Sequence, residues 1–145
     1  MTIRARSGRG DGSSAPVSLT KKQVADRLRR GESLTEADLR GLDLTGTSFD
    51  GCNLAYAKLA DAVLLRCTFR GADLTGASMW QADLRDANFT NAKLDDADLD
   101  MTNLDGATLY KAKIKRTLFP LDRLPMERIQ ESIRSGRRLV MNKGD

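Results

Sequence analysis

A large apolar residue recurs at every fifth position over most of the chain, and no other feature restricts the fold as strongly. The series begins at Leu34 and continues without a gap to Phe119, which gives 18 apolar positions. A small residue, most often Ala, stands two positions before most of them. A period of five matches neither an α-helix, which repeats every 3.6 residues, nor a β-strand, which repeats every two. The backbone must therefore turn a corner once in every five residues.

The repeating block has the form Ala-Asp-Leu followed by two variable residues, as in residues 72–76, 82–86 and 97–101. It resembles the pentapeptide-repeat family. The resemblance implies an all-β solenoid, a right-handed quadrilateral β-helix in which four pentapeptides form one coil. Eighteen repeats would then form about four and a half coils. The expected structural core includes Phe49, Phe69, Phe89, Leu74, Leu84 and Leu94.

A second period, of twenty residues, supports four sides per coil. Phe49, Phe69 and Phe89 are twenty residues apart, as stacked side chains of equal size would be. Outward charges repeat in the same way, with seven opposite-charge pairs and one like-charge pair at this spacing. The opposite pairs are Asp38 with Lys58, Asp50 with Arg70, Arg66 with Asp86, Asp73 with Lys93, Arg85 with Asp105, Asp95 with Lys115, and Asp96 with Arg116. Parallel strands lie about 5 Å apart, so stacking would bring these charges together.

The N-terminal flank differs from the repeats in composition. Residues 1–17 are rich in Gly, Ser and Arg, and we expect a disordered basic tail there. Thr20 and Gln23 have the spacing of a capping box and Gly31 offers a stop, so residues 18–31 are predicted to contain a short helix. The end of a solenoid exposes apolar groups and unpaired strand edges. We therefore expect this helix to cap the first coil.

The repeat pattern changes near residue 118. Leu118 takes an outward position that is polar in most repeats, and Pro120 cannot donate to a β-ladder. The β-helix is therefore predicted to span residues 32–121.

A second helix is predicted within residues 122–145. Pro125 suits the first helical position and Gly136 suits the stop. The apolar residues of this segment are spaced as one helical stripe, Met126, Ile129 and Ile133. The helix either caps the last coil or, as the resemblance implies for some family members, forms a homodimer through residues 124–140.

The residue types offer little for catalysis. The sequence contains no His, which is the commonest general base and metal ligand, and no nucleophile–base set or phosphate-binding glycine loop. The many Asp residues follow the repeat and are interpreted as part of the scaffold. Cys52 and Cys67 both take the small inward position and are fifteen residues apart, so they are not stacked and no disulfide is expected. We expect no enzyme activity, no metal site and no cofactor.

Charge and hydropathy favour a cytoplasmic protein. No apolar segment reaches the length of a membrane span, and the basic N-terminus lacks the apolar core of a signal peptide. The net charge of +4 is divided into +6 for residues 1–31, −4 for residues 32–121 and +2 for residues 122–145. Basic arms are usually only solvated, so we do not expect direct contact of these flanks with nucleic acid or a membrane.

One side of the predicted coil stands out after the stacked charge pairs are set aside. It contains Trp80, the only tryptophan, at an outward position. Its predicted neighbours on this side are Gln81, Asp61, Asp98, Asp100 and Met101. An exposed aromatic ring beside a thioether and acidic groups is typical of a protein-interaction site. The alternative is that a flank folds over Trp80 and buries it.

These features predict a non-enzymatic scaffold or adaptor that presents a flat β-helix face to a protein partner. The resemblance implies an alternative, because some family members mimic duplex DNA and bind DNA gyrase or topoisomerase IV, which gives quinolone-type resistance or gyrase regulation. The slight net acidity of the repeats argues against it, since duplex DNA carries one negative charge per ~1.7 Å. The sequence does not identify the partner.

Overall fold

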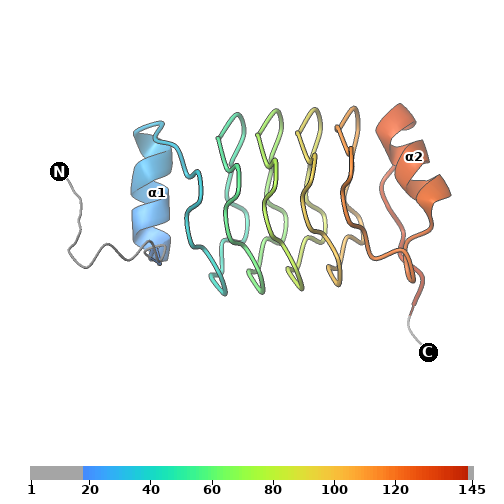
Figure 1. Ribbon diagram of the computed structural model, residues 1–145, viewed down its shortest axis with the longest axis horizontal. Helices are drawn as coiled ribbons and strands as arrows, with labels where there is room; N and C mark the ends of the chain where they lie inside the picture. Colours follow the sequence, from blue (N-terminus) through green and yellow to red (C-terminus); the bar gives the residue numbers. More distant parts are fainter. Residues whose placement is uncertain (1–17, 144–145) are drawn as a thin grey trace.

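The structure is a computed structural model that describes residues 18–143. A stack of coils lies between two helices, α1 (Lys21–Arg29) at the N-terminal end and α2 (Met126–Ser135) at the C-terminal end (Figure 1). The tail predicted for residues 1–17 lies outside the described residues.

Parallel β-bridges join residues that are twenty positions apart. The series runs from the bridge of Ser18 with Asp38 to the bridge of Asp98 with Leu118. Each bridge is isolated, because the chain turns a corner directly after it. Four pentapeptides therefore separate each residue from the residue stacked on it.

The corners require a left-handed backbone. Asp61 and Gln81 have φ values of 60°, and Met101 has a φ of 62°. A hydrogen bond closes each turn, as where the Ala82 N–H donates to the Met79 carbonyl oxygen at 2.9 Å. A left-handed residue with a side chain costs roughly 1–2 kcal/mol, and stacking against the neighbouring coils offsets this cost. Side chains at these corners point away from the core and are available for contacts.

The interior is a column of stacked apolar side chains. The rings of Phe49 and Phe69 are 5.2 Å apart, those of Phe69 and Phe89 are 5.0 Å apart, and both pairs are nearly parallel. Leu74, Leu84 and Leu94 are likewise fully buried. Removal of such side chains from water stabilises the fold by about 1.5–3 kcal/mol each.

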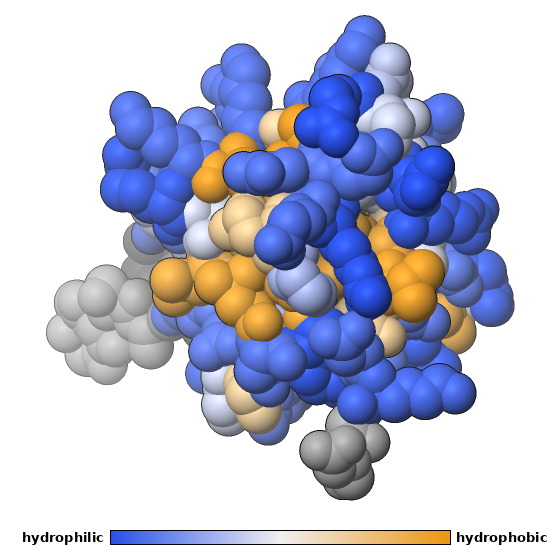
Figure 2. All heavy atoms as spheres, turned by 90° about the vertical axis from the view of Figure 1, so that its right-hand side faces the viewer, coloured by the Kyte–Doolittle hydropathy of each residue, from blue (hydrophilic) through white to orange (hydrophobic). Residues whose placement is uncertain are grey.

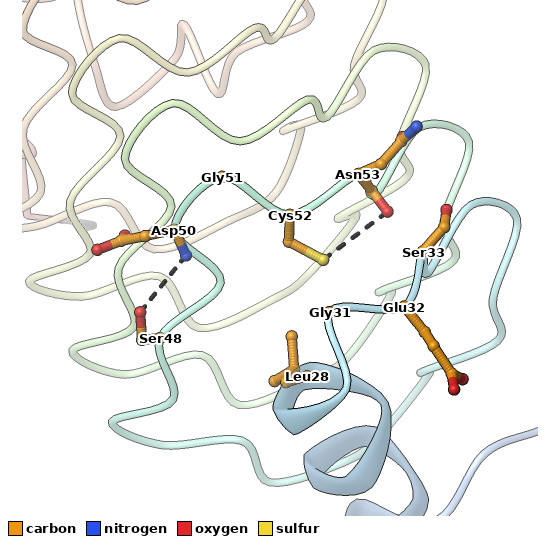
Figure 3. A pocket seen from close by; sticks show the side chains of 9 residues that line it. All are labelled: Leu28, Gly31, Glu32, Ser33, Ser48, Asp50, Gly51, Cys52 and Asn53. Carbon is orange, nitrogen blue, oxygen red and sulfur yellow. Dashed lines mark hydrogen bonds between the residues drawn. The ribbon is translucent and has the colours of Figure 1, made fainter.

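The helix α1 begins with the capping box that the sequence indicates. The Gln23 N–H donates to the Thr20 hydroxyl at 3.1 Å, and the Thr20 N–H donates to the Gln23 side chain at 2.8 Å. Val24 is buried against the first coil. The end of α1 leaves a pocket of about 440 Å³ beside the first coil, lined among others by Leu28 and Cys52 (Figure 3). The expectation that Cys52 belongs to the core is therefore wrong in part, because its side chain is only half-buried.

At the C-terminal end, α2 and residues 137–143 supply acceptors to the last coil. In earlier coils, the N–H groups at corresponding positions donate to carbonyl oxygens nineteen residues later, as where Leu84 donates to Asn103. In the last coil, the acceptors are the Met141 sulfur for Leu104, the Leu139 carbonyl for Gly106, the Ser132 hydroxyl for Leu109 and the Ile133 carbonyl for Lys111. Buried N–H groups need such partners, so this segment covers the end of the stack.

Candidate functional site

The side of the stack that carries Trp80 is here named the Trp80 side and comprises residues 37–41, 57–61, 77–81, 97–101 and 117–121. Its central residues, such as Met79 and Leu99, are fully buried. Successive residues of an extended segment point to opposite faces. The residue that follows each central position therefore points outward, and Trp80 follows Met79.

Trp80 is exposed to 40% of its surface, and neither helix of the described residues buries it. Of its predicted neighbours, Gln81, Asp61 and Met101 are exposed, whereas Asp98 and Asp100 are half-buried. All six residues lie on one side of the stack, because the bridges along this side keep the register of twenty residues. The predicted group is thus brought together as a surface rather than as a cleft.

Backbone contacts hold this surface in place. The Asp61 N–H donates to the Trp80 carbonyl oxygen at 3.0 Å, and the Gln81 N–H donates to the Asp100 carbonyl oxygen at 3.3 Å. The side chain of Asp98 accepts from the Asp100 N–H at 2.9 Å, and that of Asp100 accepts from the Met101 N–H at 2.9 Å. Two of the three acidic side chains therefore also stabilise the turn on which Met101 stands.

The structure adds two residues to this side that the sequence analysis did not include. Leu118 and Leu121 are exposed and add apolar side chains to this side on the coil that follows Met101. Leu118 pairs with Asp98, and its carbonyl oxygen accepts from the Leu99 N–H at 2.7 Å. Its unusual outward position is therefore part of the surface as well as a sign that the repeats end. The spacing of twenty residues from Asp98 was the signal that could have shown this.

The charge pairs differ from the stacked pairs that the sequence suggests. Among the described residues, two of the seven stacked pairs form ion pairs, Asp50 with Arg70 at 2.9 Å and Asp96 with Arg116 at 2.6 Å. Other arginines turn to an aspartate two residues earlier on their own coil. These pairs are Asp38 with Arg40 and Asp83 with Arg85.

The same-coil pairs form because residues two apart point to the same face and a guanidinium group matches a carboxylate with two hydrogen bonds. Asp83, which belongs to none of the seven stacked pairs, is held in this way. Its hydrogen bonds with Arg85 lower the pKa of the Asp83 carboxyl.

Among residues 18–143, no group of three or more His, Cys, Asp or Glu side chains is close enough to share a metal ion. The two helices found in this part of the chain are too short to cross a lipid bilayer.

Comparison with known proteins identifies the family of the repeats. The family model described as pentapeptide repeats, with 8 copies, matches residues 33–71, 52–91 and 82–119. The crystal structure of alr5209, a pentapeptide repeat protein from Nostoc PCC 7120, is 34% identical, aligns over 73% of this chain and 88% of that chain, and has a TM-score of 0.67. These matches imply a right-handed β-helix and indicate no catalytic family.

Two further structures are less similar. Rfr23, a pentapeptide repeat protein from the cyanobacterium Cyanothece 51142, is 28% identical over 57% of this chain and 64% of its own, with a TM-score of 0.33. A trypsin-treated form of QnrB1, a plasmid-mediated fluoroquinolone resistance protein, is 22% identical over 60% of each chain, with a TM-score of 0.29. No curated protein sequence matches the chain. The repeat matches and the alr5209 structure show that the chain belongs to the pentapeptide repeat family.

Proposed function

We propose that the protein is a non-enzymatic scaffold or adaptor in the cytoplasm and that it binds a protein partner through the Trp80 side. The observation that carries the proposal is the exposure of Trp80 on a flat side that also exposes Met101 and Leu118. Tryptophan is enriched among the residues that contribute most to protein interfaces. Such a ring offers a large contact area with only two rotatable side-chain bonds.

The energy available from Trp80 can be estimated from its exposed fraction. A tryptophan side chain can bury up to about 250 Å², so the exposed 40% corresponds to roughly 100 Å². Burial of that area against a partner would contribute about 2.5 kcal/mol. Met101 and Leu118 extend the contact, although association costs offset part of the gain. Trp80 would be the aromatic anchor of a small interface, with Met101 one coil further on and Leu118 two coils further on.

The charges around this apolar centre indicate the chemistry of the partner. Asp61, Asp98 and Asp100 carry carboxylates on the same side as Trp80. A partner with an apolar centre and basic residues at its rim would complement them. We therefore favour a partner segment that combines aliphatic with Lys or Arg side chains.

Mimicry of duplex DNA toward DNA gyrase or topoisomerase IV is the second candidate. Residues 31–110 carry fourteen acidic and six basic side chains, a net charge of −8, and this acidity is the observation that favours it. Duplex DNA of the same height, about 20 Å, carries about 12 negative charges. The acidic belt reproduces part of that charge, but it lies between two basic ends. We rank this candidate below the general adaptor.

Site-specific photo-crosslinking in extracts of the native host tests the proposal. A benzophenone amino acid replaces Gln81 in one variant and Asn91 in the control. Both residues are exposed corner residues with a φ of 60°, and they lie two sides apart on the same coil. We expect a crosslinked protein from position 81 that is absent from position 91. Equal crosslinking at both positions would contradict a partner on the Trp80 side, and crosslinks to gyrase subunits would favour the second candidate.

A further inference from the structure

The C-terminal end of the stack is the most basic part of the described chain. Residues 111–143 contain ten basic and three acidic side chains, a net charge of +7. All ten basic residues are exposed: Lys111, Lys113, Lys115, Arg116, Arg123, Arg128, Arg134, Arg137, Arg138 and Lys143. Four of them belong to the last repeats rather than to the flank. A sum over residues 122–145 alone therefore underestimates the charge of this end.

Large apolar side chains lie exposed among these basic groups. Leu139 and Met141 are buried against the last coil, so Val140 between them points outward and is 60% exposed. Leu121 and Met126 are also exposed at this end. Figure 2 shows the same end, with hydrophobic atoms among hydrophilic ones.

The segment that presents Val140 is held firmly. The Arg128 guanidinium donates to the Val140 carbonyl oxygen. The Asn142 N–H donates to the Arg123 carbonyl oxygen at 2.7 Å, and the Arg123 guanidinium donates to the Asn142 carbonyl oxygen at 3.1 Å. Basic and apolar side chains are thus fixed next to each other.

Although the composition of the flanks alone did not lead us to expect membrane contact, we propose that this C-terminal end binds to the surface of an anionic lipid membrane. Lys and Arg side chains near such a surface each contribute about 1 kcal/mol, and exposed aliphatic side chains add to binding by entering the boundary between headgroups and acyl chains. The N-terminal end offers a comparison within the molecule. Residues 18–30 have a net charge of +4 but none of the large exposed apolar residues of the described chain. Only the C-terminal end combines both properties.

Other occupants of this end fit less well. A second copy paired end to end would bring two basic ends together, which stay net positive although Arg116 and Arg138 are paired with Asp96 and Asp86. Proteins that bind single-stranded nucleic acid stack its bases on exposed aromatic side chains. The Tyr110 ring at this end instead packs on Gly136 and has the Lys111 ammonium group 5.1 Å from its centre.

Sedimentation of the full-length protein with lipid vesicles tests the proposal. One set of vesicles contains phosphatidylcholine alone, and the other contains about one third phosphatidylglycerol. We expect binding to the anionic vesicles only. The double change Met126→Ser with Val140→Ser should weaken that binding by at least about tenfold. Lys113→Glu should weaken vesicle binding as well. It should not unfold the protein, because residue 113 is bridged to Lys93 and the new carboxylate would be stacked on a basic residue.

Two controls separate this surface from the rest of the molecule. Met101→Ser removes an exposed apolar residue from the Trp80 side, and Lys21→Glu reverses a charge at the N-terminal end, as Lys113→Glu does at the C-terminal end. Both should leave vesicle binding unchanged. Equal binding to both vesicle types, or binding that tolerates the Met126/Val140 change, would overturn the proposal. Stronger retention on duplex DNA than on vesicles would assign this end to nucleic acid instead. The fluorescence of Trp80, the only tryptophan, should not shift on vesicle binding, so this test is independent of the proposed protein partner.

Discussion

Ser132 is a buried polar residue on which the C-terminal end of the stack depends. It lies in α2, is fully buried, and its hydroxyl oxygen accepts from the Leu109 N–H at 2.9 Å. Ser132→Ala removes one oxygen atom and leaves that N–H without an acceptor in a dry site. An unsatisfied buried donor costs about 1–3 kcal/mol, which exceeds the small cavity term. For a chain of this size, we expect Tm to fall by roughly 4–12 °C.

Calorimetry and amide hydrogen exchange test this expectation together. Ser135→Ala is the comparison, because the residue lies in the same helix but is exposed. Its hydroxyl accepts from the Arg137 N–H at 3.1 Å, but water can replace it there, so the change should lower the free energy of unfolding by less than about 1 kcal/mol. The Leu109 amide should exchange faster in Ser132→Ala than in the control. Equal Tm values for the two variants, with unchanged protection of Leu109, would refute the reasoning that α2 supplies this acceptor.

Three further predictions follow from burial and charge. Phe69→Ala should lower the free energy of unfolding by about 3–5 kcal/mol, whereas Trp80→Ala should cost far less; equal losses in urea titrations would show that Trp80 is part of the core. The hydrogen bonds of Arg40 hold the pKa of the Asp38 carboxyl well below its usual range. The contribution of this ion pair to the free energy of unfolding is therefore present at neutral pH and is lost as the pH falls below about 4. Asp38→Asn should therefore reduce the loss of stability in acid, and an unchanged pH profile from urea titrations would count against it. Burial raises the pKa of the Cys67 thiol to about 11, so iodoacetamide should alkylate Cys52 first in the native protein, as mass spectrometry of the modified peptides would show.

The sequence was sufficient to predict most of the residues that face inward, with the half-buried Cys52 as an exception. The period of five predicts a corner in every repeat, the resemblance to the pentapeptide-repeat family implies four sides, and the spacing of twenty between Phe49, Phe69 and Phe89 supports them. The outward position of Trp80 followed from the same register. These features depend on the backbone repeat, and each pentapeptide repeats the same pattern of inward and outward positions.

Features that depend on a choice between equivalent side-chain contacts were not predictable. Arg85 could reach Asp105 on the next coil or Asp83 on its own coil, and the shorter connection prevails in the structure. Ser132 and Met141 complete the last coil from outside the repeat, so the period of five contains no information about them. Leu121 lies at the end of the pattern, where an apolar residue is equally compatible with a cap or with an exposed surface.

The central claim is that Trp80 anchors a protein partner. The most direct test compares the proteins that immobilised full-length protein retains from extracts of the native host, using the wild type, Trp80→Ala and Tyr56→Ala. Tyr56 is also an exposed aromatic residue, but it lies on another side, where its ring packs over Gly76. A partner that binds through Trp80 should be retained by the wild type, lost with Trp80→Ala and kept with Tyr56→Ala. Retention of the same proteins by all three would contradict it.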